Sequence, residues 1–387
     1  MMGNSTDLFL DRTKRILNFF AMWRSFEKPI PLKVYMAFIM TTQYLFLIFE
    51  IIYIVNVWGD MAEVSEASIL LFTQASVCYK MTAFISKTNN FVILLGLIES
   101  EIFSAQTELH EKILILKARK IKRLCMFFLV NAVTTCSLWA VIPLLDISSK
   151  MLPFKIWMPV STGESPHYEL GYLYQMITIY ISAFLFISVD SVPLSMIMFG
   201  CAQLEIIMDK IGKVKSWSLD QQPMQKQEVL NSNYELLVEC VRRYQSVVRF
   251  IELTEKTYHA NIFFQLSGSV FIICNIGFRI AIVDNNSLQF YSMLTYLVTM
   301  LSQLFQYCWC GHELTIRGEE LRETLYQSPW HEQDIRYRKV LIITMERMKR
   351  PIIFKAGHYI PLSRPTFVAI LRCSYSYFAV LNRVRNE

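Results

Sequence analysis

The feature that most constrains this 387-residue chain is the uneven distribution of its positive charge. Thirty of the 38 Lys and Arg residues lie in four segments, which carry six, seven, eight and nine of them and span 12–33, 87–123, 210–256 and 317–355. The outer segments that alternate with these carry none (57–65), two (Lys150 and Lys155), none (284–288) and two (Arg383 and Arg385), and the other four cations lie in or at the ends of spans. Lys and Arg are retained on the cytoplasmic side of short membrane loops. The pattern therefore predicts an all-α membrane protein with seven transmembrane helices, its N-terminus cytoplasmic and its C-terminus extracellular.

Composition agrees with a membrane protein and argues against several other classes. Hydrophobic residues make up 53% of the chain and charged residues 18%, which is too apolar for a soluble domain of this length. The net charge of +6 is spread over the inner segments without a basic block, so we expect no nucleic-acid partner. The nine cysteines lie in spans or on the inner side, and we expect them to be reduced. No nucleotide loop, metal cluster or catalytic triad is visible, so we expect no enzymatic activity, no metal and no cofactor.

Seven apolar runs approach the ~20 residues with which a helix crosses a bilayer. We expect spans at about 34–56, 67–86, 123–145, 170–199, 260–283, 288–311 and 365–382. The fifth and seventh are polar for membrane segments, so they should face protein or water rather than lipid. Three charged residues stand out within spans. Glu50 lies toward the outer end of the first span, whereas Lys80 and Asp190 lie at compatible depths near the inner side. Lys80 either pairs with Asp190 or extends to the inner leaflet.

The inner segments contain more than loops. Apolar residues from Leu237 to Tyr258 recur mostly at three- and four-residue spacing, which predicts a helix that runs without a break into the fifth span. The fourth span should continue to Gly212, and a further inner helix is expected at 332–349. The Gln-rich stretch 215–230 is the best candidate for a disordered loop. The inner helices either lie on the membrane surface or form a cytoplasmic anchor bundle on which subunits assemble. The bundle is favoured because the apolar residues that recur from Leu237 to Tyr258 would otherwise be exposed to water.

The last eighty residues carry a series of short motifs. In order they are Gln306-Tyr307, Gly311, Leu321 to Tyr326, Trp330, Arg338-Lys339, Arg347-Met-Lys-Arg-Pro351, Ala356-Gly357, Pro361-Leu-Ser363, Thr366-Phe367 and Ser374-Tyr-Ser-Tyr-Phe378. This series resembles the C-terminal signature of the insect odorant receptors, and the length and inverted spans are similar to that family as well. Two positions depart from it: Cys373 stands where the family usually has Thr, and the family's usual Gln is replaced around Lys349-Arg350.

Within that family, the chain resembles a tuning subunit. The common odorant co-receptor is longer and has an extended second inner loop, for which 200–258 is too short. The related gustatory receptors carry Thr-Tyr, five apolar residues and Gln-Phe in the last span, and this element is absent.

The resemblance implies a ligand-gated, non-selective cation channel that acts as a heterotetramer with the co-receptor. Its other partners would be a small volatile apolar ligand, membrane lipids and permeating cations. The expected location is the plasma membrane of dendrites of olfactory sensory neurons. The chain would divide into spans one to four with the ligand pocket (1–199), the anchor extensions of spans four and five (200–259), spans five and six (260–311), a cytoplasmic anchor segment (312–363) and the pore-lining helix (364–387).

In this family the odorant pocket lies in the outer half of spans two, three, four and six. Counting inward from the outer ends of these spans gives fifteen candidates: Phe72, Ser76, Tyr79, Thr135, Leu138, Trp139, Ile142, Tyr172, Gln175, Met176, Ile179, Tyr180, Tyr291, Leu294 and Tyr296. Aromatic residues and Met with a few hydroxyls suit a volatile bound mainly by burial of apolar area. The same residues could equally serve ordinary helix packing, and Trp139 is the leading candidate.

One face of the last span is a candidate pore lining. Cys373, Tyr377, Val380 and either Arg383 or Val384 recur at spacings of three and four, so they share one helical face. This face either packs against another helix or, as the resemblance implies, lines a central pore closed by an apolar ring. The resemblance places Val380 at the gate and Arg383 at the outer mouth, where a positive charge should disfavour cation entry.

Three other classes stay open. A seven-span receptor that signals through G proteins requires an extracellular N-terminus, and its usual Asn-Pro-x-x-Tyr and Asp/Glu-Arg-Tyr motifs are absent. A secondary transporter should show matching halves, which this chain lacks. A gustatory-type channel would form without a co-receptor.

Overall fold

The computed structural model describes residues 5–145, 152–159, 165–216, 223–281, 283 and 287–386, without the side chains of 61–62, 223–225, 381–382 and 384–386. The described residues form ten α-helices and a two-stranded hairpin. The elements are α1 (Ser5–Phe19), α2 (Ile30–Asn56), α3 (Met61–Ser86), α4 (Thr88–Ile98), α5 (Glu108–Leu145), α6 (His167–Ile211), α7 (Pro223–Ile280), α8 (Leu288–Gln327), α9 (Ile335–Met348), β1 (Lys355–Ala356), β2 (Ile360–Pro361) and α10 (Arg364–Asn386).

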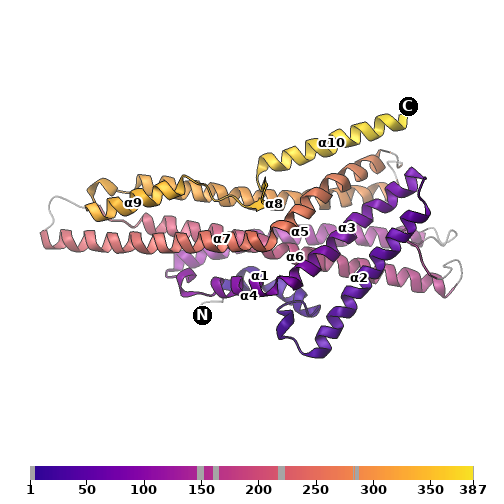
Figure 1. The fold of residues 1–387 in the computed structure, drawn as a ribbon, viewed down its shortest axis with the longest axis horizontal. Helices are drawn as coiled ribbons and strands as arrows, with labels where there is room; N and C mark the ends of the chain where they lie inside the picture. The colour runs from indigo at the N-terminus through magenta and orange to yellow at the C-terminus, as the bar shows by residue number, and fades with distance from the viewer. Residues whose placement is uncertain are drawn as a thin grey trace.

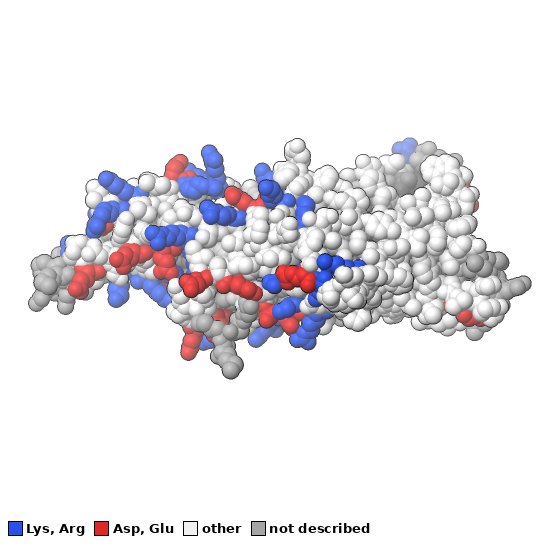
Figure 2. Space-filling view, turned by 60° about the horizontal axis from the view of Figure 1, so that its bottom comes forward, with Lys and Arg blue, Asp and Glu red and all other residues white. Residues whose placement is uncertain are grey.

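The helices form an elongated bundle with two distinct halves. The long helices α7 and α8 run through both halves, whereas α2, α3 and α10 lie in one half and α9 in the other (Figure 1). On the face shown in Figure 2, charged side chains cover the half that holds α9, and the opposite half is nearly bare of them. Charged side chains are costly in hydrocarbon, so the uncharged half is the membrane-spanning half.

The seven predicted spans are helical, the fifth of them as far as Ile280. Among the described helices, α2, α3, α5, α6 and α7 are long and apolar enough to cross a membrane. The other two predicted spans lie in α8 and α10, which do not reach that apolarity. The described part of α10 therefore agrees with the polar character predicted for the seventh span, whereas α7, which holds the fifth span, reaches the apolarity of a membrane helix.

The central helix of the bundle is α6. It packs against α1, α3, α5, α7 and α8, and every side chain from Leu185 to Leu204 is buried. Close approach is possible because small residues interrupt this stretch. A Cβ added at Gly200 would lie 2.7 Å from the side chain of Ile251 in α7, so α6 and α7 meet at this glycine.

Both predicted helical extensions beyond the membrane-spanning half are confirmed. α6 continues to Ile211, and α7 is continuous from Pro223 through the membrane-spanning half. The prediction of a disordered loop at 215–230 is wrong from Pro223 onward, because these residues are helical. Proline suits the first turn of a helix, where its fixed φ is already helical and its missing N–H has no intrahelical partner to lose. Residues 217–222 lie outside the described residues.

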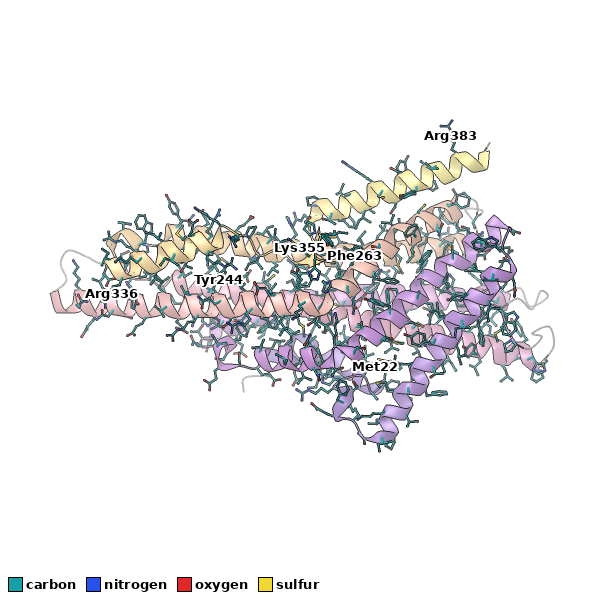
Figure 3. The ribbon with its side chains drawn as sticks, viewed as in Figure 1. Met22, Tyr244, Phe263, Arg336, Lys355 and Arg383 are labelled. Carbon is teal, nitrogen blue, oxygen red and sulfur yellow. The ribbon has the colours of Figure 1, made fainter. Side chains whose placement is uncertain are left out.

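The β1–β2 hairpin fixes the start of α10. Its turn residue Gly357 has φ +58°, and a Cβ there would lie 2.6 Å from the ring of Phe263 in α7. Lys355 of β1 lies beside the same region of α7 (Figure 3). Leu362, which follows β2, packs so closely on Gly311 of α8 that a Cβ at Gly311 would lie 2.3 Å from the Leu362 Cβ. The hairpin therefore ties the first turn of α10 to both long helices.

Candidate ligand cavity

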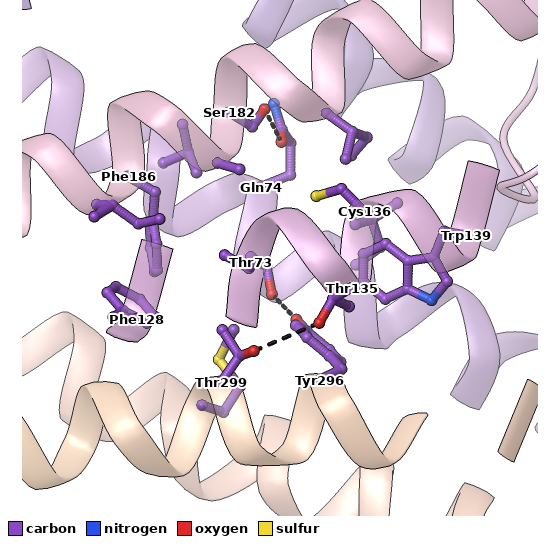
Figure 4. Close-up of a pocket in the computed structure, with 17 residues that line it drawn as sticks. Thr73, Gln74, Phe128, Thr135, Cys136, Trp139, Ser182, Phe186, Tyr296 and Thr299 are labelled. Carbon is purple, nitrogen blue, oxygen red and sulfur yellow. Dashed lines mark hydrogen bonds between the residues drawn. The ribbon is translucent and has the colours of Figure 1, made fainter. Parts of the chain in front are cut away.

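A cavity lies among α3, α5, α6 and α8 in the uncharged half (Figure 4). Its volume is about 60 Å³, several times the ~10–15 Å³ that one water molecule requires. Seventeen residues line it: Leu70, Thr73, Gln74, Val77, Phe128, Ala132, Thr135, Cys136, Trp139, Ile179, Ser182, Ala183, Phe186, Ile187, Tyr296, Thr299 and Met300. Most of these side chains are aliphatic or aromatic, which is typical of a site for a small apolar molecule.

Each helix contributes residues from a single face. The α5 lining runs from Phe128 to Trp139, and the α6 lining runs from Ile179 to Ile187. Within each run the lining positions are separated mainly by three or four residues, so they lie on one side of the helix. The cavity therefore lies between the inward-facing sides of four helices, whose side chains do not fill the space between them.

The polar groups of the lining are already hydrogen-bonded to one another. The pairs are Tyr296 with Thr73, Thr135 with Thr299 at 3.5 Å between hydroxyl oxygens, and Ser182 with Gln74 at 3.0 Å (Figure 4). A ligand that used one of these groups would have to replace an existing hydrogen bond, so its net gain would be small. The cavity favours molecules that bind through apolar contact.

Trp139 separates this cavity from a second, outer one of about 250 Å³. Trp139 and Leu70 line both cavities. The indole ring packs edge-on against Tyr296, with centroids 5.0 Å apart, and against Phe154 of the outer loop, with centroids 5.2 Å apart. A ligand that passed from the outer to the inner cavity would have to move past this indole ring or Leu70.

Charged side chains line the outer cavity. Lys155 of the outer loop lies 2.7 Å from Glu63 and 3.2 Å from Glu66, and Arg279 of α7 lies 2.8 Å from Glu66. These ion pairs tie the loop to α3 and α7. Glu50 of α2 is different, because it is 1% exposed and neither carboxylate oxygen has a hydrogen-bond partner among the described residues.

A buried polar network lies next to the inner end of the cavity. Lys80 Nζ is 2.8 Å from Asp190 Oδ1 and donates to Gln265 Oε1 at 2.7 Å, and Gln303 also donates to Asp190. The same ammonium group lies 3.8 Å from the ring centroid of Phe186, which lines the cavity. Of the two interpretations of Lys80 from the sequence, the ion pair is confirmed, and extension to the inner leaflet is wrong.

Four of the fifteen ligand candidates line the inner cavity: Thr135, Trp139, Ile179 and Tyr296. A fifth, Ile142, lines the outer cavity beside Trp139. The structure thus brings together candidates from α5, α6 and α8.

The three candidates on α3 face α7 instead of the cavity. Phe72 stacks on Phe271 with centroids 5.6 Å apart, Tyr79 packs on Phe264 with centroids 4.9 Å apart, and Ser76 donates to Gln265 at 3.0 Å. Counting from the end of the span gave roughly the right depth and the wrong rotation about the helix axis.

The remaining seven candidates line neither cavity: Leu138, Tyr172, Gln175, Met176, Tyr180, Tyr291 and Leu294. Several have structural partners. Tyr172 donates to the Ala140 carbonyl at 2.7 Å, and Gln175 accepts from the backbone N–H of Phe154 in the outer loop at 3.0 Å. Tyr291 and Leu294 are 50% and 40% exposed on the outer surface of α8.

Sequence reasoning missed the inner part of the lining. From Thr135, steps of three and four residues toward the inner side lead to Ala132 and Phe128, and from Ile179 they lead to Ser182 and Phe186. The signal was therefore present in the helical repeat. On α5 and α6 the candidates end about two helical turns short of the inner end of the lining, at Phe128 and Ile187.

The candidate pore residues lie on a face of α10 that its own chain leaves uncovered. Cys373, Tyr377, Val380 and Arg383 are all exposed, and Arg383 points away from the bundle (Figure 3). The side chain of Val384 lies outside the described residues. α10 packs mainly on α7 and α8 through its other face.

Comparison with known proteins gives one consistent result. A family model described as 7tm Odorant receptor matches residues 60–375. Odorant receptor 46a, isoform A, of Drosophila melanogaster is 25% identical over the full length of both chains. Odorant receptor Or1 of Anopheles gambiae is 23% identical, covering 85% of this chain and 83% of its own. The solved structure of the olfactory receptor OR5 from Machilis hrabei in complex with eugenol superposes with a TM-score of 0.83, at 14% identity, and covers 99% of this chain and 100% of its own.

Proposed function

The chain belongs to the insect odorant receptor family, and from that premise we propose that it is the odorant-binding subunit of a ligand-gated, non-selective cation channel. It acts in a heterotetramer with the odorant co-receptor, in the plasma membrane of olfactory sensory dendrites. Its N-terminus is cytoplasmic and its C-terminus extracellular. Binding of a volatile in the membrane-spanning half opens the pore.

The observation that carries this proposal is the apolar cavity among α3, α5, α6 and α8. Apolar burial contributes about 25 cal/mol per Å², so a ligand that buries on the order of 200 Å² gains about 5 kcal/mol. The similar receptor OR5 was solved with eugenol, which supports a small volatile as the ligand class here.

The uncovered face of α10 supports a pore between subunits. A helix with exposed Tyr377 and Val380 has an unpartnered surface in the isolated chain. Four such helices arranged around one axis would enclose a conduit, with Val380 as the apolar constriction that excludes water when closed. Arg383 lies one turn farther toward the C-terminus, at the outer mouth.

The cytoplasmic half supports subunit assembly. Ile335, Ile342 and Ile343 of α9 are 68%, 65% and 71% exposed in a half of the molecule that is otherwise rich in charge. Exposed apolar side chains in such surroundings mark a protein contact surface. We assign this surface to contacts between subunits in the anchor bundle.

The test is whole-cell current under a panel of volatiles, with the chain expressed alone and together with an insect co-receptor. We expect a non-selective cation current that requires both the volatile and the co-receptor. Trp139→Ala should then raise the half-maximal volatile concentration on the order of tenfold or more, because it removes a large apolar contact.

A matched control is Trp58→Ala, since Trp58 is 78% exposed at the outer end of α2. This variant should respond as the parent does. Current from the chain alone would indicate a homomeric channel. If surface expression is verified and no volatile evokes current in either case, the proposal fails.

A further inference from the structure

A basic groove lies between α1 and α5, away from the ligand cavity. Its volume is about 340 Å³, and its lining consists of Leu8, Arg12, Ile115, Ala118, Arg119, Lys122, Arg123 and Met126. On α5, Arg119, Lys122, Arg123 and Met126 follow at i, i+3, i+4 and i+7, so they form one face of the helix. Half of the lining residues are cations, and none is a carboxylate.

The four cations of the groove have no counter-ion in the part of the chain that the structure describes. Among the described residues, Arg12, Arg119, Lys122 and Arg123 form no ion pair. The nearby carboxylates of α1 are engaged elsewhere. Asp7 pairs with Lys14 at 2.6 Å, and Asp11 pairs with Arg15 at 2.8 Å. Four like charges around one groove repel one another, and a multivalent anion would relieve that repulsion.

The groove lies at the border of the membrane-spanning half. Charged residues on α5 end at Arg123, and the remaining 22 residues of the helix, from 124 to 145, contain none. Directly beyond the groove, Met126, Phe127 and Val130 are 39%, 54% and 55% exposed. Figure 2 shows Lys and Arg side chains reaching the edge of the uncharged surface. The cations therefore sit at the depth of lipid headgroups, with lipid-facing side chains next to them.

The groove continues inward as a narrow crevice. Arg12 and Lys122 line both, and the crevice ends among Ile187, Ser188 and other residues of α6. Ser188 is 1% exposed, and its hydroxyl has no hydrogen-bond partner among the described residues. Ile187 also lines the ligand cavity. One buried side chain thus separates the crevice from the ligand cavity.

We propose that this groove binds the phosphorylated headgroup of an anionic phospholipid of the cytoplasmic leaflet, of the phosphoinositide class. Arg12, Arg119, Lys122 and Arg123 contact the phosphates, and the acyl chains lie along Met126 and the exposed apolar face of α5. Basic pockets between helices on the cytoplasmic side of a membrane recognise such headgroups. A monovalent headgroup would satisfy only part of the charge.

The test uses the purified full-length chain in detergent and a fluorescent phosphatidylinositol bisphosphate, measured by anisotropy at fixed ionic strength. We expect saturable binding that weakens with added salt, and weaker binding of phosphatidylserine. The main variant replaces all four groove cations by Gln, and each removed cation should weaken binding about fivefold. If this quadruple variant does not fold, the single variants Arg119→Gln and Lys122→Gln test the same prediction. The matched control removes four exposed basic residues elsewhere in the cytoplasmic half: Arg242, Arg322, Lys339 and Arg350.

Binding that is equal in the groove variants and in the control variant would overturn the proposal. A second result would also overturn it: a soluble inositol phosphate or an acidic hexapeptide that displaces the fluorescent lipid at the same concentration as unlabelled lipid does. The acyl chains would then contribute nothing to binding. Since the measurement needs neither a volatile nor a co-receptor, its outcome is independent of the channel proposal.

Discussion

The Lys80–Asp190 pair is the strongest single test of how the membrane-spanning half is held together. Both residues are buried, at 1% and 3% exposed. Lys80 interacts with both carboxylate oxygens of Asp190, at 2.8 and 2.9 Å, and with Gln265 and the ring of Phe186. Breaking a buried pair from one side costs about 3–5 kcal/mol, because a charge is left without its partner. We therefore expect Lys80→Met to lower the free energy of unfolding by about 4 kcal/mol.

Thermal unfolding of the detergent-solubilised protein measures this effect. For a chain longer than 250 residues, 1 kcal/mol shifts the melting temperature by about 2 °C or less, so Lys80→Met should lower it by about 5–8 °C. The double variant Lys80→Met/Asp190→Leu should recover most of the loss, because neither charge then remains in the interior. Lys33→Met is the matched control, since Lys33 is exposed. Two results would refute the reasoning. One is a melting temperature of Lys80→Met or Asp190→Leu no lower than that of the control, and the other is a double variant whose loss of melting temperature equals the sum of the two single losses.

Three further predictions concern packing, pH and conduction. Gly311→Ala should lower the free energy of unfolding by about 1–3 kcal/mol, because the new Cβ would lie 2.3 Å from Leu362. Gly268→Ala is the control: no atom lies within 4 Å of a Cβ at Gly268, so the melting temperature should stay unchanged or rise. Burial lowers the pKa of His110, so the folded state binds a proton less readily than the unfolded chain, and stability should fall as pH drops below about 6.5. His110→Gln should flatten the melting-temperature profile between about pH 7.5 and 5.5, and an unchanged profile would contradict this. In the assembled channel, Arg383→Gln should raise single-channel cation conductance, and an equal or lower conductance would exclude Arg383 from the outer mouth.

The long helices could be predicted from the sequence because their signals are local. Charge bands and apolar runs predicted every span, and the repeat from Leu237 to Tyr258 predicted the part of α7 that extends beyond the membrane-spanning half. The error at Pro223 has a physical origin. A Gln-rich composition lacks an apolar face and suggests disorder, but proline is well suited to the first turn of a helix. Here a long helix that is stable farther along extends back to its proline.

The cavity was less predictable because its lining depends on helix rotation. Consecutive residues of a helix point about 100° apart, so an error of one position turns a side chain from the cavity to a neighbouring helix. This happened on α3, where Phe72 faces α7 and Thr73 lines the cavity. Rotation is decided by packing between helices that are distant in sequence. No local pattern in α3 shows that α7 covers one of its faces and the cavity adjoins another.

The arrangement of helices also limits how a bound ligand can act on α10. The described lining of the cavity comes from α3, α5, α6 and α8, and the main contacts of α10 are with α7 and α8. Only α8 belongs to both groups. Tyr296 lines the cavity near one end of α8, and Phe305 packs against Phe367 of α10 with ring centroids 5.8 Å apart. Gly311 packs against Leu362, two residues before the start of α10. A displacement of α8 at Tyr296 would therefore reach the first turns of α10 by direct contact, whereas a displacement of α3, α5 or α6 would first have to move α7 or α8.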